Sequence, residues 1–267
     1  MLIFDVDGVI TNPQEKRITE SEILDEIIKT LKRKEPVALN TGRSVSWMIE
    51  KVIDPLIKKI EDKTILKNFF AVGEKGGTWA EFDNQGHLII NKDENISVPD
   101  DLKNEVRNLI KNMFSDGMFY DESKLTMISA EMKDGHSLEN YKEKQKILIN
   151  EFEKILSKDK LNKRFKIDPT TITLDIENIF VGKHFAVKRI IGWVKEKGFK
   201  PQEYITIGDS FKSDVPMAEE LYSQNLPVKF VYVGKEEINT SKYSFPIKNT
   251  NKKYGEGTLE FLKSLSG

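Results

Sequence analysis

The chain has 267 residues, 38% of them hydrophobic and 32% charged, so it can form one large domain or two modest ones around an apolar core. Its 42 lysines and arginines nearly balance its 43 aspartates and glutamates, which argues against nucleic acid or an anionic membrane as the partner. It contains no cysteine, which excludes disulfides, thiolate catalysis and thiolate metal sites.

Residues 1–80 alternate short apolar runs with helical periodicity. A helix is predicted over 21–34, where the apolar residues fall on one face, and a second helix is expected after Ser44, with a break near Pro55. Strands are predicted over 2–6, 36–40 and 69–73. Strands that alternate with helices in this way indicate a parallel sheet with crossover helices.

The pattern changes between residues 81 and 178. A hairpin is expected around Asn84-Gln85-Gly86. The other elements predicted here are helices over about 99–114 and 138–156, a strand over 124–132, and two short strands divided by Asp168-Pro169. These elements favour antiparallel pairing, so residues 81–178 are expected to form an inserted α+β domain.

The first pattern resumes near Lys183, with a helix over 184–197, strands over 204–209 and 228–234, and a helix over 256–265. Residues 1–80 and 179–267 together therefore predict one α/β domain with a Rossmann-like parallel sheet. No stretch reaches the roughly 20 apolar residues of a membrane-spanning helix. A secretory signal is also missing, so we expect a soluble, cytoplasmic protein, as a monomer or small homo-oligomer.

Four polar segments follow or flank predicted strands of this α/β domain: "DVDGVIT", "NTGRS", "VGKHFA" and "GDSFKSD". Ligands of an open parallel sheet bind beyond the carboxyl ends of its strands, so these segments are expected to meet in one pocket. They supply carboxylates, a hydroxyl and an ammonium from Asp5, Asp7, Thr41, Lys183, Asp209 and Asp214.

This set of groups suits phosphoryl transfer to an aspartate. Carboxylates are the ligands that Mg²⁺ prefers, and a metal together with a lysine can neutralise a phosphate and its transition state. An aspartate can act as the nucleophile, and a second carboxyl two residues away can act as general acid and then as general base.

The four segments resemble the motifs of the haloacid dehalogenase superfamily of phosphohydrolases. "DVDGVIT" is similar to its first motif, Asp-x-Asp-Gly-x-x-Thr, and "LNTGRS" to its second. Lys183 matches the third motif and "GDSFKSD" the fourth, with one residue more between its aspartates than in the common Gly-Asp-x-x-Asn-Asp. The resemblance covers nearly the whole chain.

The resemblance implies a role for each matching residue. Asp5 would be the nucleophile, Asp7 the general acid and base, and Thr41 a ligand of a phosphate oxygen. Mg²⁺ would be held by Asp5, the carbonyl of Asp7 and Asp209. Asp214 would support the metal site or Lys183.

Gly42 and Arg43 follow Thr41 and are candidate substrate contacts, although a structural ion pair explains Arg43 equally well. In this superfamily, an insert between the second and third motifs marks the larger cap of the sugar-phosphate phosphatases and phosphomannomutases. "AVGEKGGTW" resembles the segment that leads into that cap, but Lys75 stands where asparagine or histidine is usual.

Within the insert, the polar residues of "KLTMISAEMKDGH" are the candidates for substrate selection: Lys124, Glu131, Lys133 and His136. Strand alternation places Glu131 on one face with Ser129. A charge that protects an edge strand from aggregation is an equally good explanation of Glu131.

The sequence as a whole predicts a Mg²⁺-dependent phosphatase for a small phosphorylated metabolite, a sugar phosphate being favoured. One alternative is a phosphomutase, which needs a second phosphate site, for which the insert offers the arginines Arg107 and Arg164. The other is a binding domain that kept the fold without catalysis.

Overall fold

A computed structural model of the chain describes residues 1–158 and 160–265, which form two compact units. The larger unit combines Met1–Asn91 with the chain from Gly182 onward, and the smaller unit is Lys92–Val181. Among the helices that the structure describes, none is long and apolar enough to cross a membrane.

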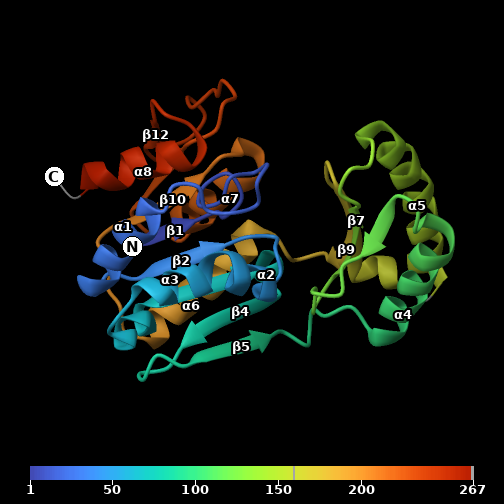
Figure 1. Cartoon of the computed structure of the whole chain (residues 1–267), viewed down its shortest axis with the longest axis horizontal. Helices are drawn as coiled ribbons and strands as arrows, with labels where there is room; N and C mark the ends of the chain where they lie inside the picture. Colours follow the sequence, from blue (N-terminus) through green and yellow to red (C-terminus); the bar gives the residue numbers. More distant parts are fainter. Residues whose placement is uncertain (159, 266–267) are drawn as a thin grey trace. The chain divides into compact units, whose positions relative to one another are not determined.

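The larger unit is built on an eight-stranded sheet with β1 in its interior (Figure 1). From one edge to the other, the strands are β12 (Ile247–Asn249), β11 (Val228–Tyr232), β10 (Tyr204–Gly208), β1 (Leu2–Phe4), β2 (Val37–Asn40), β3 (Phe69–Gly73), β4 (Thr78–Phe82) and β5 (Leu88–Lys92). The strands from β12 to β3 are parallel, and β4 is antiparallel to β3. The predicted α/β fold with a mainly parallel sheet is therefore confirmed.

Helices cover both faces of this sheet because the strand side chains alternate between two apolar cores. Leu2 and Phe4 belong to one core and Ile3 to the other. The helices of the first core are α1 (Glu22–Lys32), α2 (Val45–Met48), α3 (Asp54–Lys59) and α8 (Tyr254–Leu265), and those of the second are α6 (Lys183–Glu196) and α7 (Phe211–Ser223). A π-helical segment, Ile49–Ile53, joins α2 to α3.

The smaller unit contains a four-stranded antiparallel sheet and two main helices. The sheet order is β6 (Met118–Tyr120), β7 (Ile128–Met132), β9 (Thr173–Asn178) and β8 (Phe165–Pro169). The helices α4 (Asp100–Leu109), continued by the π-helical segment Ile110–Phe114, and α5 (Leu138–Lys158) contribute to the same apolar core as Ile128, Ala130 and Ile176. Since strand side chains alternate, the opposite face of β7 and β9 carries polar residues.

The smaller unit, Lys92–Val181, begins and ends later in the chain than the predicted insert, 81–178. β4 pairs with β3 and β5 with β4, so the expected hairpin extends the sheet of the larger unit, and the smaller unit begins at Lys92. The sequence of the hairpin does not indicate which sheet it joins, because a strand with alternating apolar residues can pair in either one. Among the described strands and α-helices, β6, β12 and α7 were not predicted, and both of these strands have only 3 residues.

Candidate active site

Two neighbouring interior strands of the sheet, β1 and β10, are each followed by an aspartate. Asp5 directly follows β1, and its N–H donates to Ile207 O of β10 at 2.9 Å. Asp209 directly follows β10, which is parallel to β1. The strand order reverses between β1 and β10, because the chain continues from β1 to β2 on one side and from β10 to β11 on the other. The two carboxylates therefore lie at the switch point, where ligands of such sheets bind.

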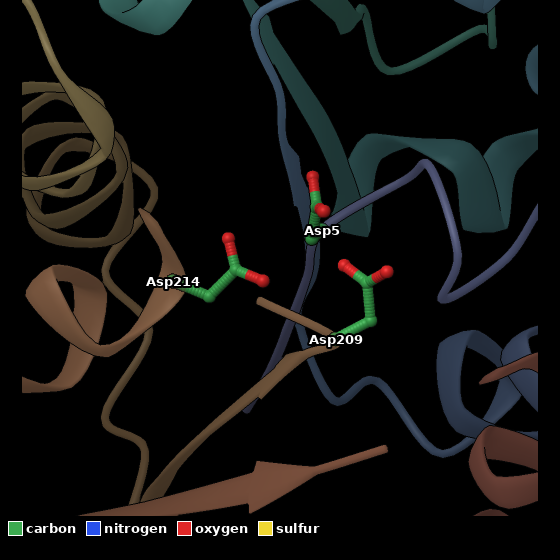
Figure 2. A group of neighbouring side chains, drawn as sticks. All are labelled: Asp5, Asp209 and Asp214. Atoms are coloured by element: carbon green, nitrogen blue, oxygen red, sulfur yellow. The ribbon is translucent and has the colours of Figure 1, made fainter. Parts of the chain in front are cut away.

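A third aspartate completes a cluster of carboxylates. One oxygen of each of Asp5, Asp209 and Asp214 lies within 4.8 Å of the others (Figure 2). Burial, to which the neighbouring carboxylates add, raises the pKa of Asp5 well above its usual range. Burial and the charge of Asp214 raise the pKa of Asp209 to about 7. Negative charge on these two carboxylates is therefore unfavourable.

Lys183, the first residue of α6, supplies the ammonium of this cluster. Its Nζ lies 2.7 Å from Asp5 Oδ1 and also donates a hydrogen bond to Asp214 Oδ1. Burial lowers the pKa of Lys183, but the charges of Asp214 and Asp5 outweigh it, and the pKa lies above its ordinary value. Lys183 is therefore a charged bridge between two buried carboxylates.

Asp214 already has a donor on each carboxylate oxygen. Oδ2 accepts from the Ser210 N–H at 2.9 Å, and Oδ1 accepts from Ser213 Oγ at 2.9 Å and from Lys183. The residue is 0% exposed. This arrangement fits a residue that positions Lys183 and the loop after β10 better than it fits a direct metal ligand, so it favours the supporting role among those implied by the resemblance.

The residues of the first motif form a tight turn that leaves room for the side chain of Asp209. Gly8 has a φ of +75°, and a Cβ on it would lie 2.1 Å from Asp209 Oδ2. The turn closes through the Gly8 N–H, which donates to Thr11 O at 2.8 Å, and through Thr11 Oγ1, which donates to Val6 O at 3.2 Å. A glycine at position 8 is required both by the backbone conformation and by the adjacent carboxylate.

Asp7 lies beside Arg43 and not among the three clustered carboxylates. Arg43 Nε donates to Asp7 Oδ2 at 3.0 Å and Nη2 donates to Oδ1 at 3.0 Å. The guanidinium also stacks on Trp47, with its carbon 5.0 Å from the ring centroid. Of the two explanations of Arg43 from the sequence, the structure contains the ion pair.

Thr41 directly follows β2, which lies next to β1 in the sheet. It is 1% exposed, its N–H donates to Val72 O at 3.0 Å, and its Oγ1 accepts from the Arg43 N–H at 3.2 Å. A hydroxyl that accepts one bond still has a hydrogen to donate. Ser44 then caps α2, because its side chain accepts from the Trp47 N–H at 3.2 Å.

Asn40 is a site residue that the sequence analysis missed. Its Nδ2 donates to the backbone oxygen of Lys183 at 2.9 Å, and it is 0% exposed. Its Oδ1 is buried without a partner among the described residues. Asn40 thereby ties the end of β2 to the start of α6. A polar residue at the end of the apolar run "PVALN" was the available signal.

The candidate residues of the insert all lie in the smaller unit. Lys124 precedes β7 and is buried; Glu131 is half-buried on β7; and Lys133 Nζ donates to Ser115 O at 2.5 Å. His136 is exposed. The predicted alternation is confirmed from 128 to 132, where Ile128 and Ala130 face the core.

The smaller unit also contains a second carboxylate group that the sequence analysis missed. Asp168, Asp175 and Glu177 each have a carboxylate oxygen within 4.8 Å of the others. Ser129 Oγ donates to Asp175 Oδ1 at 2.6 Å, and Lys166 Nζ lies 3.3 Å from Glu177 Oε1. The alternation of "TLDIEN" was the signal, since it puts Asp175 and Glu177 on one face of β9.

The chemistry of the cluster in the larger unit fits a hard divalent cation. Asp5 and Asp209 supply oxygen ligands at one edge of the sheet, and their raised pKa values reflect burial and mutual repulsion, the repulsion being what a cation would relieve. The predicted metal site therefore has suitable residues at Asp5 and Asp209.

No protein-family model matches the sequence, and no curated protein matches it. Solved structures with 12 to 20% identity do share its fold. A haloacid dehalogenase-like hydrolase from Bacteroides thetaiotaomicron matches with a TM-score of 0.67 and 12% identity, over 99% of this chain and 98% of that chain. The C-terminal domain of trehalose-6-phosphate phosphatase from C. albicans matches with a TM-score of 0.65 and 16% identity, over 100% of this chain and 92% of that chain.

An IMP-nucleotidase from Plasmodium falciparum has a TM-score of 0.60 and 15% identity, over 99% of this chain and 68% of that chain. These matches extend over both units of the chain and agree with the motifs found in its sequence. The chain therefore has the fold of the haloacid dehalogenase-like hydrolases.

Proposed function

We propose that the protein is a phosphatase that hydrolyses the phosphomonoester of a small metabolite through Asp5. The observation that carries this proposal is the position of Asp5: it is buried at the switch point of the sheet, 2.7 Å from the Lys183 ammonium and beside Asp209. The names of two proteins with this fold, a trehalose-6-phosphate phosphatase and an IMP-nucleotidase, support a phosphate ester as the substrate.

In the proposed reaction, a carboxylate oxygen of Asp5 forms a bond to phosphorus while the bond from phosphorus to the ester oxygen breaks. The alcohol leaves with a proton donated by Asp7. A water molecule then attacks the aspartyl phosphate, Asp7 accepts a proton from it, and inorganic phosphate leaves with the Asp5 carboxylate restored. Thr41 and Lys183 hold the oxygens of the phosphoryl group and offset their charge.

Mg²⁺ is the proposed cofactor, held by Asp5, the Asp7 carbonyl and Asp209. When bound, it would offset the negative charge that the phosphate adds to the carboxylate cluster. Asp214 is proposed to position the residues of this site and not to bind the metal directly, because both of its carboxylate oxygens already accept hydrogen bonds.

The smaller unit is proposed to act as a cap that selects the substrate, a sugar phosphate being favoured. A core that recognises only the phosphate cannot discriminate among esters, so selection requires contacts with the rest of the molecule. Lys124, Glu131 and Lys133 remain the candidates, and the polar face of β7 and β9 adds Asp175 and Glu177.

A phosphomutase is less well supported, because the arginines available for a second phosphate already have partners. Arg107 donates to both oxygens of Glu122, at 2.6 and 2.9 Å, and Arg164 donates to Asn95 O at 3.4 Å. A binding domain without catalysis is disfavoured because none of the four motif aspartates has been lost.

The test is phosphate release from para-nitrophenyl phosphate with Mg²⁺, with excess EDTA, and by the variant Asp5→Asn. We expect turnover with Mg²⁺ that EDTA abolishes and added Mg²⁺ restores, and no turnover by a folded Asp5→Asn. An inactive wild-type protein across a panel of phosphorylated metabolites would refute the phosphatase assignment. Full activity in EDTA would refute the metal.

A further inference from the structure

The segment that follows β3 has an unusual backbone. Glu74 and Lys75 have φ values of +50° and +54°, and Gly76 has +111°. Glycine adopts positive φ freely, but the left-handed region is costly for glutamate and lysine. Such conformations persist only where the surrounding structure imposes them, and they are concentrated at functional sites.

Hydrogen bonds from two parts of the candidate site impose this conformation. The Glu74 N–H donates to Arg43 O at 2.9 Å, and the Lys75 N–H donates to Thr41 O at 3.0 Å. On the other side, the Gly182 N–H donates to Lys75 O at 3.1 Å. The strained segment therefore connects the loop of the second motif to the residue that precedes Lys183.

The side chain of Lys75 extends along that loop. Its Cε lies 3.7 Å, and its Cγ 3.9 Å, from the position that a Cβ on Gly42 would occupy. Gly42 directly follows Thr41, whose hydroxyl is proposed to hold a phosphate oxygen. Lys75 is thus packed against the backbone that would surround the phosphate.

The charges of the site give this lysine a role. Lys183 is bonded to Asp5 and Asp214, and Arg43 is bonded to both oxygens of Asp7. These two cations already offset part of the negative charge of the aspartates. A phosphate dianion brings two further negative charges, and additional positive charge beside it favours its binding.

We propose that Lys75 is a phosphate-binding residue of this site and that it sets the affinity for the substrate's phosphoryl group. The proposal rests on the proposed phosphatase function, since it assigns Thr41 and Gly42 to the phosphate. Its strained backbone is then explained, because the left-handed conformation places a lysine side chain over Gly42.

Three variants separate the charge of Lys75 from its backbone. Lys75→Gln removes the charge and keeps a long side chain in the same conformation, Lys75→Arg keeps the charge, and Lys75→Asn relieves the strain. The matched control is Lys34→Gln, because Lys34 also has a positive φ, +62°, and is exposed at the end of α1. Inorganic phosphate binding in Mg²⁺, measured by calorimetry, and KM for para-nitrophenyl phosphate are the readouts.

Lys75→Gln and Lys75→Asn should weaken phosphate binding and raise KM by about tenfold, which corresponds to about 1.4 kcal/mol. Lys75→Arg should stay within about threefold of the wild type, and Lys34→Gln should be unchanged. Lys75→Asn should also raise the Tm, since asparagine tolerates the left-handed region.

A higher Tm for Lys75→Asn with unchanged phosphate binding would reduce Lys75 to a structural residue and overturn the inference. If the wild type is active and Lys75→Gln has the same phosphate affinity and KM, the inference is overturned and the phosphatase function is left intact. A wild type that neither binds phosphate nor hydrolyses the ester would overturn both.

Discussion

Arg43 holds both carboxylate oxygens of Asp7, with Nε 3.0 Å from Oδ2 and Nη2 3.0 Å from Oδ1. A bidentate pair of this kind fixes the plane and the direction of the carboxylate. If Asp7 gives a proton to the leaving alcohol, that proton occupies a lone pair that Arg43 does not use, because each carboxylate oxygen has two. Arg43 therefore acts on the proposed reaction through the orientation of Asp7.

Asp7→Asn should lower kcat/KM, which reports the steps up to release of the alcohol, far more for an alkyl phosphate than for para-nitrophenyl phosphate. An alkoxide is a poor leaving group that needs a proton, whereas para-nitrophenolate leaves without one. General acid catalysis contributes about 10²-fold or more, so we expect that loss for the alkyl ester and a much smaller loss for the aryl ester. Asp83→Asn, at a β-turn in the same unit, is the control. Equal losses on both esters would exclude Asp7 as the general acid.

The parts of this site that could be predicted are those that depend on the chain order. Short apolar runs ending in Asp5, Thr41 and Asp209 predict parallel strands, and the carboxyl ends of such strands lie at one edge. This reasoning needs no side-chain geometry, and the structure places Asp5 and Asp209 together as expected.

The parts that could not be predicted depend on contacts between distant side chains. The resemblance already suggested that Asp214 supports the metal site or Lys183, but nothing in the pattern indicates that its other oxygen accepts from the Ser210 N–H, or that Asn40 holds the Lys183 backbone. The hairpin was assigned to the insert for the same reason, because the partner of an alternating strand is decided by packing and not by its own sequence.

The free energy of unfolding of the metal-free protein should fall as the pH rises from about 4 to about 7. Burial and the charge of Asp214 raise the pKa of Asp209 from 3.8 to about 7, and that of Asp5 is raised in the same direction. The folded chain then binds protons more tightly than the unfolded chain, so stability present at low pH is lost as the folded carboxyl ionises. For Asp209, the full shift is worth about 4 kcal/mol.

Thermal melts in EDTA check this prediction with Asp209→Asn as the comparison. The variant should melt well above the wild type at pH 8 and close to it at pH 5, because the wild-type carboxyl is already protonated there. Mg²⁺ should then raise the Tm of the wild type at pH 8 and leave that of the variant unchanged. The same Tm difference at both pH values would show that Asp209 is not destabilised by its neighbours.

Gly8→Ala should abolish activity by displacing Asp209. The new Cβ would stand 2.1 Å from Asp209 Oδ2, which is impossible without moving that carboxylate, and the φ of +75° adds backbone strain. Gly198→Ala is the matched control, since Gly198 has a φ of +72° and a Cβ on it would meet nothing within 4 Å. Both variants should lose about 1 kcal/mol of stability from strain, but Gly198→Ala should keep its turnover. An active Gly8→Ala variant would show that activity does not depend on the observed position of the Asp209 carboxylate.

Glu131→Ala should reduce discrimination among substrates without harming the phosphate chemistry. Glu131 is half-buried on β7, on the face opposite the apolar core of the smaller unit, and its strand pairs with the part of β9 that carries Asp175. Carboxylates on one sheet face accept hydrogen bonds from sugar hydroxyls and repel a second phosphate. Chemistry at Asp5 does not involve this face, so a small aryl ester should be hydrolysed as before.

The measurement compares kcat/KM for the best metabolite in a panel of phosphate esters with kcat/KM for para-nitrophenyl phosphate. Glu131→Ala should lower the first by about tenfold or more, the loss expected for a buried polar contact, and leave the second within about twofold. Lys133→Ala should have a smaller effect, because its ammonium already bonds to Ser115 O. Glu143→Ala, an exposed position on α5, controls for charge alone and should change neither value. Equal losses on both esters would mean that Glu131 contributes to the stability of the smaller unit, and no loss on either would exclude it from substrate selection. Protection of an edge strand does not explain Glu131, because β7 lies between β6 and β9.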